Sequence, residues 1–497
     1  MKTIFPKQMQ KLEKSLLEKG YVSSLMLMEK AAFEIVRQLE KTIGFGKVLF
    51  LCGPGNNGGD GFAAARLYTA DGGDAIVWKT GGRKSEDCLI QEEQLQLLWP
   101  QVKQREIPFD YAQVPIHGVC CVVDCLFGTG LDRPLSEEMR ELVSYINTLP
   151  IPKIAVDIPS GIDGTTGKIQ GNAIKADTTI TFHRPKIGLY LNDGVEYSGE
   201  IKTVSIGIPP WLDTLEGGRV TSPVHVKNFF GKRKKNDYKG TYGHILVIAG
   251  SMGMAGAAMF VGKSALVCGA GLVTFATMEE VLMILQQSLP CAMGISLWNK
   301  EGFHREKITK MLTEKMALFD AVVFGPGLGR EQDWGFLVEI LSTVEIPVVW
   351  DGDGLYHLSK SCKRKKLPFF HILTPHVGEG AYLIEESIEA IQKDPIKGAS
   401  KICERYGASV ILKGARSISY QENRYGINPT GTPALAKGGS GDVLSGVVAA
   451  LAARKPRKDI TQENIFEVMT CACYLHGKAG ERAEKTLGEN GVLATDV

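Results

Sequence analysis

The sequence lacks any long hydrophobic run. None of its apolar segments approaches the roughly 18 residues that a membrane-spanning helix requires. Residues 1–10 carry charges and a proline where a secretory signal would need an apolar core. The 57 basic and 55 acidic residues leave a formal net charge of only +2, too little for a broad field that attracts nucleic acid or a membrane surface. These absences predict a cytoplasmic protein of small-molecule metabolism, with neither a nucleic-acid nor a membrane partner.

Cysteine pairs at metal-binding or redox spacing are also absent. The chain has 11 cysteines, an odd number, and no C-x-x-C pattern. Such patterns mark zinc sites and thiol-redox pairs, so the sequence predicts neither. We expect reduced, mostly buried thiols, as in other intracellular proteins. The one basic run, residues 232–235, is expected to be a solvated surface segment.

Glycine, by contrast, is abundant, with 57 residues among 497, and many glycines follow short apolar runs. In the first half these runs predict buried strands at 48–51, 75–78, 119–123, 154–156 and 178–182. Helical spacing is expected over 1–40, 62–68, 89–98 and 136–148. Strands that alternate with helices indicate a mainly parallel sheet covered on both faces. The first half is therefore predicted to be an α/β domain.

The second half repeats this alternation without repeating the sequence. Its predicted strands are 244–249, 321–324, 347–350, 371–373 and 409–412, and its predicted helices are 257–268, 399–405 and 447–452. No short period relates the two halves, which excludes a solenoid. A polar stretch from about 212 to 240 separates them and is typical of a domain junction. We expect domains at 1–212 and 225–497, joined by a linker at 213–224.

The loop after the first strand, residues 53–61, reads GPGNNGGDG. It contains a formal G-x-G-x-x-G, which alone is a weak signal. An ordinary dinucleotide site would also need an acid at the end of the second strand, and that strand ends in Lys79, Thr80 and Gly81. An ordinary redox cofactor is therefore not expected. The free N–H groups at the start of the following helix would still favour an anion.

Two further strand ends are polar and glycine-rich. One carries Asp124 and the segment 128–134, and the other carries Asp157, Ser160 and Gly161. Ligands of open α/β sheets bind beyond the carboxyl ends of the strands, so these segments are expected to converge. Asp157 could then act as a general base, although a lone aspartate at a strand end is as often structural. Oxygen atoms of Asn57, Asp124 and Ser160 could hold a monovalent cation.

The segments 53–61, 123–134 and 156–161 together resemble the NAD(P)H-hydrate epimerase domain, the YjeF N-terminal family, and the resemblance spans about residues 1–210. It implies a Rossmann-like three-layer fold that interconverts the two epimers at C6 of the hydrated nicotinamide ring. By this resemblance Asp157 binds substrate and is the catalytic base, and K⁺ is held by Asn57, Asp124 and Ser160. The other implied substrate contacts are Asn56, Asn57, Gly58, Gly59, Asp60, Gly128, Thr129, Gly130, Leu131, Asp132, Arg133 and Pro134.

The strongest signal lies at residues 437–446, which read KGGSGDVLSG before an apolar helix. A glycine-rich stretch that opens a helix directs free N–H groups and the positive end of the helix dipole at an anion, most naturally phosphate. Asp442 could take a proton from a hydroxyl that faces that phosphate. No Walker loop exists, because Ala257 stands where the motif ending in Gly262-Lys263-Ser264 would need glycine. The chemistry is therefore kinase-like without a P-loop.

Four polar loops are expected to lie beside this motif. They read GPGLG at 325–329, TPHVGE at 374–379, KGARS at 413–417 and NPTGTP at 428–433. Lys413 at a strand end could meet a nucleotide phosphate as a point charge. His376 alone would more often be an ordinary polar residue, but its place beside Glu379 favours a role in a site.

These loops, with the segment 437–446, resemble the ADP-dependent NAD(P)H-hydrate dehydratase, the YjeF C-terminal family of the ribokinase-like superfamily, over about 225–497. The resemblance implies that ADP phosphorylates the hydrate hydroxyl, that phosphate then leaves, and that Mg²⁺ and a homo-oligomer are involved. It makes Asp442 the base and gives Ala257, Gly327, His376 and Asp442 contacts to the hydrated nucleotide. The implied ADP contacts are Lys413, Gly414, Ala415, Arg416, Ser417, Thr432, Lys437, Gly438, Gly439, Ser440 and Gly441. At Asp351-Gly352 the chain departs from the family, which usually has alanine after the acid.

Three functions remain to be weighed. The favoured one is a fused repair enzyme that epimerises the R and S hydrates of NADH and NADPH (NADHX and NADPHX) and dehydrates the S form with ADP, giving AMP and phosphate. The second is a ribokinase-like small-molecule kinase with an N-terminal regulatory domain, which leaves the segment 56–60 unexplained. The third, a non-catalytic binding protein, would tolerate loss of Asp157 and Asp442, and both are present. The first two functions can be distinguished by measuring whether the protein consumes ADP or ATP.

Overall fold

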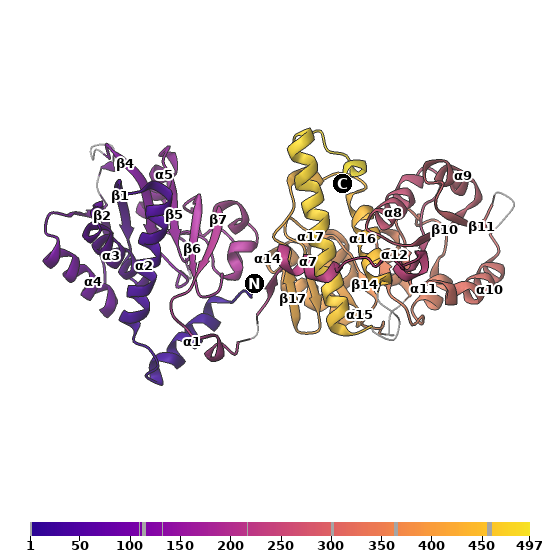
Figure 1. Cartoon of the computed structure of the whole chain (residues 1–497), viewed down its shortest axis with the longest axis horizontal. Coiled ribbons are helices and arrows are strands. Elements are labelled where there is room, and N and C mark those ends of the chain that lie inside the picture. The colour runs from indigo at the N-terminus through magenta and orange to yellow at the C-terminus, as the bar shows by residue number, and fades with distance from the viewer. Residues whose placement is uncertain are drawn as a thin grey trace. The chain divides into compact units, whose positions relative to one another are not determined.

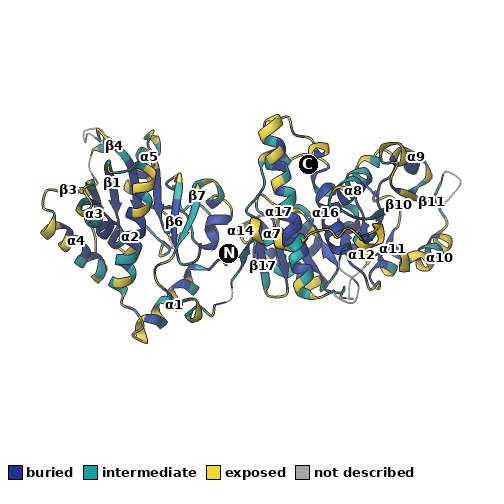
Figure 2. Cartoon of the chain, in the orientation of Figure 1, coloured by how far each residue is buried: buried dark blue, intermediate teal, exposed yellow. Residues whose placement is uncertain are grey.

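The computed structural model describes residues 2–108, 110–111, 116–131, 133–215, 217–299, 303–361, 366–454 and 460–497. The chain forms two compact units, Met1–Gly218 and Arg219–Val497, and each has its own sheet (Figure 1). Figure 2 shows the strands of both sheets mostly buried, while the covering helices expose their outer faces. The predicted α/β class is thus confirmed for both halves.

The first unit contains, in its described part, a seven-stranded parallel sheet in the order β3-β2-β1-β4-β5-β6-β7. This order, in which β1 and β4 lie at the centre, is that of doubly wound Rossmann-type sheets. The strands are β1 (Lys47–Cys52), β2 (Asp74–Thr80), β3 (Lys103–Ile107), β4 (Val119–Cys125), β5 (Lys153–Val156), β6 (Thr178–Phe182) and β7 (Glu200–Val204).

Helices cover both faces of this first sheet and give three layers. They are α1 (Pro6–Glu18), α2 (Ser24–Ile43), α3 (Asn56–Ala70), α4 (Glu86–Leu98), α5 (Glu137–Thr148) and the short α6 (Gly194–Tyr197). Along β1, Val48 and Phe50 pack with buried residues of α1 to α4, whereas Leu49 and Leu51 pack with α5. Successive side chains of a strand point to opposite faces, so β1 is apolar throughout because both of its faces are buried.

The second unit has a ten-stranded sheet among its described residues, in the order β11-β10-β9-β12-β13-β14-β15-β16-β17-β8. The strands from β11 to β15 are parallel, and β16 is antiparallel to both of its neighbours. The bounds are β8 (Arg219–Val220), β9 (His244–Ile248), β10 (Leu272–Met278), β11 (Met293–Trp298), β12 (Ala321–Phe324), β13 (Val348–Trp350), β14 (Ile372–Leu373), β15 (Ser409–Leu412), β16 (Ile418–Gln421) and β17 (Arg424–Ile427).

The helices of the second unit pack on this sheet, and its main core joins β9, β10 and β12 to α8, α16 and α17. The helices are α7 (Pro223–Phe230), α8 (Ala255–Val267), α9 (Glu279–Ser288), α10 (Arg305–Lys315), α11 (Gly335–Leu341), α12 (Asp353–Ser361), α13 (Val377–Ile384), α14 (Ile388–Lys393), α15 (Pro395–Tyr406), α16 (Ser440–Ala453) and α17 (Gln462–Leu487). The close packing of α16 on α8 matters for function, because α16 begins at the phosphate-binding motif predicted from the sequence.

The segment predicted as a linker, 213–224, contacts the first unit at its start and the second unit at its end. The Asp213 side chain is 7% exposed and pairs with His183 at 2.9 Å and Arg184 at 2.5 Å, both of the first unit. Six residues later, β8 pairs with β17 of the second sheet, and α7 follows. The chain therefore passes from one unit to the other at Gly218, within the predicted linker.

Two sequence predictions of helices need correction. The single helix expected over 1–40 is two helices, because Gly20 takes a positive φ of 69° and Ser23 then caps α2 by accepting from the Met26 N–H at 3.2 Å. The helix expected at 62–68 starts earlier, at Asn56, so residues 56–60 form its first turn rather than a loop.

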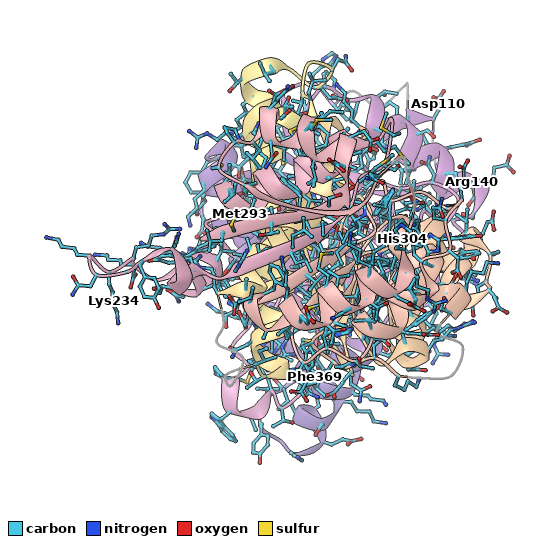
Figure 3. All side chains as sticks on the ribbon, turned by 90° about the vertical axis from the view of Figure 1, so that its right-hand side faces the viewer. Asp110, Arg140, Lys234, Met293, His304 and Phe369 are labelled. Carbon is cyan, nitrogen blue, oxygen red and sulfur yellow. The ribbon has the colours of Figure 1, made fainter. Side chains whose placement is uncertain are left out.

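Three other expectations concern surface and thiols. No described helix is long and apolar enough to cross a membrane. The basic run 232–235 is exposed as predicted, and Lys234 projects into solvent (Figure 3). None of the ten described cysteines forms a disulfide, and Cys291 is the exposed one among them.

Candidate active sites

The first site lies where the order of the first sheet reverses, between β1 and β4. Loops that leave two such strands in opposite directions open a crevice at their carboxyl ends. The loops are pressed together at Gly53, whose N–H donates to the Cys125 carbonyl at 3.0 Å. A Cβ atom on Gly53 would lie 1.7 Å from the Leu126 carbonyl oxygen, so only glycine fits there.

The predicted substrate residues 56–60 form the first turn of α3 beside this crevice. A Cβ on Gly58 would lie 1.8 Å from the Gly53 carbonyl oxygen, and one on Gly128 would lie 3.3 Å from Asn57 Cβ. The glycines thus let the helix start approach the loop after β4, and the N–H groups of this first turn are available to an anion. In that loop Arg133 and Pro134 are exposed, and Asp132 lies outside the described residues.

The predicted cation ligands Asp124 and Ser160 are brought together and fully buried. Asp124 Oδ1 accepts from Ser160 Oγ at 2.6 Å, and Oδ2 accepts from the Ser160 N–H at 2.7 Å. Burial raises the pKa of Asp124 to about 6, although hydrogen bonds from Ser160 and Leu126 lower it. In the described part of the chain no basic side chain forms an ion pair with Asp124, and the side-chain amide nitrogen of Asn57 is buried without a partner. A buried carboxylate that lacks a basic partner fits a bound cation.

Asp157, the predicted base, follows β5 with a positive φ of 66°. Such a backbone conformation is strained for a non-glycine residue and clusters at functional sites. Its carboxylate accepts from Thr181 Oγ1 at 3.2 Å and from the Phe182 N–H at 3.3 Å. It also pairs with the ammonium of Lys186, a residue only 1% exposed. A buried lysine is rare unless it is paired. The fold therefore positions Lys186 as the partner of Asp157.

Two further carboxyl groups interact with this pair. Burial raises the pKa of Asp60 well above its ordinary range, and the charges of Asp157 and Glu13 raise it further while Lys186 opposes them. Burial likewise raises the pKa of Glu13 to about 7, with Lys186 lowering it and Asp157 raising it. Glu13 comes from α1, which begins just after Ile4, a residue bridged to Lys186. Burial thus raises the pKa of two carboxyl groups that interact with the Asp157–Lys186 pair, and such groups can supply a proton near neutral pH.

The second site lies where the order of the second sheet reverses, between β9 and β12. The Gly250 N–H donates to the Pro326 carbonyl at 2.8 Å, and Ser251 Oγ donates to the Gly327 carbonyl at 2.9 Å. Gly327 has a positive φ of 59°, and a Cβ there would lie 2.9 Å from Ala257 Cβ. The predicted substrate residues Ala257 and Gly327 are therefore neighbours at this crevice.

Lys413 follows β15 and is surrounded by acids from other strand ends. Its Nζ lies 2.7 Å from Asp351 Oδ1 and 3.9 Å from Glu379 Oε2. Asp351, at the end of β13, also accepts from Ser445 Oγ of α16 at 2.7 Å. Burial alone would lower the pKa of Lys413, but Asp351 and Glu379 outweigh it, and the pKa lies above its ordinary range. A fixed ammonium is thus held at the start of α16.

Asp442 stands in the first turn of α16, next to this ammonium. Burial raises the pKa of Asp442 to about 7, and the charge of Asp351 adds to the rise while Lys413 opposes it. A Cβ on the preceding Gly441 would lie 3.2 Å from Lys413 Nζ. A carboxyl with a pKa near neutrality, beside a helix start that favours phosphate, is suited to take a hydroxyl proton during phosphoryl transfer.

His376 has a structural role that its position beside Glu379 did not reveal. Its Nδ1 accepts from the N–H groups of Gly378 at 3.0 Å and Glu379 at 3.2 Å, which caps α13. The acceptor role of Nδ1 leaves the proton on Nε2. The ring also lines a cavity of about 260 Å³ with Arg330, Gly352, Leu355, Tyr356, Gly378, Glu379 and Tyr382. His376 can therefore cap the helix and still face a ligand.

The predicted ADP loops also come together. Arg416 Nη1 donates to the Pro429 carbonyl at 2.5 Å, and a Cβ on Gly431 would lie 3.9 Å from the Ala415 carbonyl oxygen. Thr432 caps the turn that follows by accepting from the Ala434 N–H at 3.2 Å. Lys437 is directed elsewhere, because its Nζ donates to the Asn490 carbonyl at 2.7 Å and the Val492 carbonyl at 2.6 Å.

Sequence reasoning did not assign Lys186, Asp351 or His476 to a site. Asp351 and Lys186 stand at or near strand ends, and this position could have identified them as candidate site residues. His476 lies on α17 behind the glycine-rich motif, and its Nε2 is buried without a partner. Burial lowers its pKa to about 4, although a hydrogen bond to the Ser440 backbone raises it. The neutral ring therefore supports the phosphate-binding turn from behind.

Comparison with known proteins covers both units. Residues 24–188 match the family model described as YjeF-related protein N-terminus, and residues 245–497 match the model described as NAD(P)H-hydrate dehydratase. The bifunctional NAD(P)H-hydrate repair enzyme of Dictyoglomus turgidum is 32% identical over 100% of this chain and 97% of its own. That of Escherichia coli is 32% identical over 90% and 83%. Among solved structures, the ADP/ATP-dependent NAD(P)H-hydrate dehydratase of Bacillus subtilis, co-crystallised with ATP and Mg²⁺, is 26% identical, with 56% of this chain and 95% of that chain covered and a TM-score of 0.46.

Two α/β units, each with loops that converge where its strand order reverses, have the architecture of a bifunctional α/β enzyme. Relatives match it along nearly its whole length in that same order. The chain belongs to the family of bifunctional NAD(P)H-hydrate repair enzymes. This membership confirms the resemblance seen in both halves of the sequence.

Proposed function

We propose that the first unit interconverts the R and S epimers of NADHX and NADPHX, and that the second unit dehydrates the S epimer with ADP, giving AMP and phosphate. The observation that carries this proposal is the position of Asp442 in the first turn of α16, where the charge of Lys413 acts on it. That arrangement suits transfer of a phosphoryl group to a hydroxyl, while the first unit offers the buried pair of Asp157 and Lys186 for acid–base chemistry.

In the dehydratase site, ionised Asp442 accepts the proton of the C6 hydroxyl as its oxygen bonds to the β-phosphorus of ADP and AMP departs. The C6–O bond then breaks, phosphate leaves, and loss of a ring proton restores the dihydronicotinamide. Phosphate is a far better leaving group than hydroxide, which accounts for the use of a nucleotide. Lys413 and the N–H groups of Gly439 and Gly441 stabilise the transferred charge. The carboxylates around Lys413 offer oxygen ligands to Mg²⁺, which when bound offsets phosphate charge.

In the epimerase site, Asp157 accepts the proton of the C6 hydroxyl while the C6–N1 bond opens and N1 takes a proton. Rotation of the aldehyde so formed and closure on the other face give the opposite epimer. Asp60, whose pKa lies well above the ordinary range because of burial, supplies the proton to N1. Lys186 is the counter-ion of the Asp157 carboxylate. Asn57, Asp124 and Ser160 would hold K⁺ at the start of α3, where the ion would neutralise the buried Asp124 carboxylate.

The test follows recovery of reduced-nicotinamide absorbance from an epimer mixture of NADPHX, with ADP or with ATP. The full chain with ADP should convert the whole mixture. Asp442→Asn should abolish recovery, whereas Asp157→Asn should convert the S fraction at once and leave the R fraction to slow spontaneous exchange. Epimerisation itself is followed in Asp442→Asn by chromatographic separation of the two epimers.

The possible outcomes distinguish the two repair activities from each other and from the alternative kinase function. Recovery of only part of the mixture by the unmodified chain would leave the dehydratase and remove the epimerase. No recovery with either nucleotide, together with ATP-dependent phosphorylation of a hydroxymethyl compound, would favour the small-molecule kinase instead. Loss of both activities in a folded Asp442→Asn protein would contradict two separate sites.

A further inference from the structure

Three potential metal ligands of different chemistry converge in the second unit, on a face of α17 that the dehydratase site does not use. Among the described residues, His225, Glu467 and Cys471 place one ligand atom each within 4.8 Å of one another. Glu467 and Cys471 are four residues apart on α17, which puts both on one side of the helix. His225 comes from α7, more than two hundred residues earlier, so the cluster is a product of the fold.

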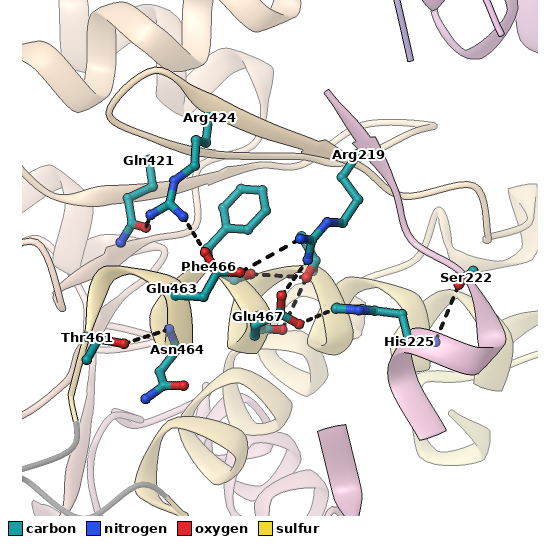
Figure 4. A network of polar contacts seen from close by, with 11 residues as sticks. Arg219, Ser222, His225, Gln421, Arg424, Thr461, Glu463, Asn464, Phe466 and Glu467 are labelled. Atoms are coloured by element: carbon teal, nitrogen blue, oxygen red, sulfur yellow. Dashed lines mark hydrogen bonds and ion pairs between the residues drawn. The ribbon is translucent and has the colours of Figure 1, made fainter. Parts of the chain in front are cut away.

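His225 joins the cluster through an ion pair. Its Nε2 is a buried atom that pairs with Glu467 Oε2. Glu467 already has a counter-ion, because its Oε1 accepts from Arg219 Nη1. Figure 4 shows Arg219 and His225 both directed at the Glu467 carboxylate. His225 and Glu467 therefore meet at one point, and Cys471 Sγ lies within 4.8 Å of a ligand atom of each.

The cluster can be reached from solvent. The His225 side chain is 23% exposed and that of Glu467 is 17% exposed, which leaves an entry path, whereas Cys471 is fully buried. Imidazole is also the commonest metal ligand among side chains.

We propose that His225, Glu467 and Cys471 form a site for a borderline divalent transition metal, Zn²⁺ in the first instance, that fastens α7 to α17. Imidazole nitrogen, thiolate sulfur and carboxylate oxygen are the ligands of tetrahedral zinc, and water would take the fourth position. Arg219 holds the second carboxylate oxygen and so orients this ligand from outside the coordination sphere. Binding transfers the Cys471 thiol proton to solvent and involves no redox change.

The site would stabilise the stretch of chain that opens the second unit. Arg219 lies in β8 and His225 in α7, the first elements after the passage at Gly218. A metal bond between α7 and α17 would hold this stretch on the core of its own unit. The expected effect is on stability and not on the chemistry of either active site, so its test does not depend on the proposed function.

The experiment titrates Co²⁺, as a spectroscopic substitute for Zn²⁺, into the full chain after removal of metals with a chelator under reducing conditions. We expect a thiolate-to-cobalt charge-transfer band and four-coordinate visible bands that saturate at one ion per chain and are displaced by Zn²⁺. Cys471→Ser should abolish the charge-transfer band. The matched control is Cys473→Ser, a buried thiol on the same helix that contacts Ser419 instead, and it should keep the band.

A second variant keeps the test decisive if Cys471→Ser fails to fold. His225→Gln changes a partly exposed side chain on the short helix α7, and circular dichroism checks that its fold is retained. We expect it to weaken Co²⁺ binding at least about tenfold and to remove the rise in melting temperature that Zn²⁺ gives the unmodified chain. The absence of a thiolate band in the unmodified chain, its persistence in Cys471→Ser, or unchanged affinity in His225→Gln would each overturn the proposal.

Discussion

The carboxyl of Asp442 is partly buried beside Lys413 and Asp351, and burial is the main reason why its pKa is raised to about 7. The ordinary pKa is near 4, so between pH 4 and 7 the folded protein keeps this carboxyl protonated while an unfolded chain would ionise it. A base must be ionised. We therefore expect kcat/KM for dehydration to fall about tenfold per pH unit below 7 and to level off above it.

Lys413 provides the check on this assignment. Because its ammonium lowers the pKa of Asp442, Lys413→Met should move the midpoint of the pH profile upward as well as weaken nucleotide binding. The measurement is initial velocity at limiting substrate from pH 5.5 to 9. A profile that stays flat across neutrality in the unmodified chain would remove Asp442 as the titrating base.

Lys186 offers a second prediction for a single residue. Its ammonium is buried and pairs with Asp157, so Lys186→Met leaves that carboxylate without its counter-ion. The carboxylate would then lose the contact that holds it in place, so epimerase activity should fall by about a hundredfold or more, with a loss of up to about 3 kcal/mol in the free energy of unfolding of the first unit. Urea unfolding and epimer separation measure the two effects.

The matched control for this prediction is Lys175→Met. Lys175 pairs with Glu196 at 2.7 Å, but both side chains are more than half exposed. Exposed pairs contribute little, so stability and both activities should be unchanged. If the two lysine variants behaved alike, the buried pair would have no special part in the site.

At the scale of elements, the contact between α16 and α8 fixes where the phosphate-binding turn lies. A Cβ on Gly446 would lie 2.1 Å from Ser264 Oγ and 2.2 Å from the Val261 carbonyl oxygen of α8. Gly446→Ala must therefore separate the two helices. We expect a cost of about 1–3 kcal/mol in the free energy of unfolding of the second unit and a lower dehydration rate, because α16 carries Asp442.

Gly256→Ala on α8 is the control for this helix contact. Nothing lies within 4 Å of a Cβ at Gly256, and alanine is the better helix former by up to about 1 kcal/mol. Its unfolding free energy should stay the same or rise slightly in chemical denaturation. Equal destabilisation by both alanines would show that the helix contact is not what makes Gly446 necessary.

The elements that carry the sites could be predicted because they are central. Strands such as β1, β4 and β12 are buried on both faces and so appear in the sequence as short apolar runs. The missed strands include edge or near-edge ones, such as β3 with its sequence KQREI and β7 with EIKTV. Edge strands face solvent on one side and carry charge, which hides them from a search for apolar runs.

Site residues that form a local sequence pattern could be predicted, whereas those defined by distant contacts could not. Asn56 to Asp60 and Ser440 to Asp442 were found because glycine before an apolar helix is a local pattern, even though the first helix starts earlier than expected. Lys186 and His476 were not, because their partners, Asp157 and the Ser440 backbone, are 29 and 36 residues away along the chain. A contact between distant segments leaves no local periodicity, so only the fold reveals it.

For the molecule as a whole, the two units keep their cores and their candidate catalytic groups separate. The buried clusters of the first unit contain no residue beyond Ile208, and the main cluster of the second begins at Val226. Asp157 and Lys186 belong to one unit, and Asp442 and Lys413 to the other. Each activity should therefore survive the loss of the other.

This separation predicts that two variants, each with a different one of the two sites inactivated, complement each other. Asp157→Asn should recover only the S fraction of NADPHX promptly, and Asp442→Asn should recover none. An equimolar mixture of the two proteins should convert the whole epimer mixture, because NADPHX released by an intact first unit is free to reach an intact second unit on another chain. Absorbance of reduced nicotinamide follows the reaction. A mixture that stalled at the S fraction, with both proteins folded, would mean that the hydrate must pass between the two sites of one chain, and the units would then be coupled in function although they fold around separate cores.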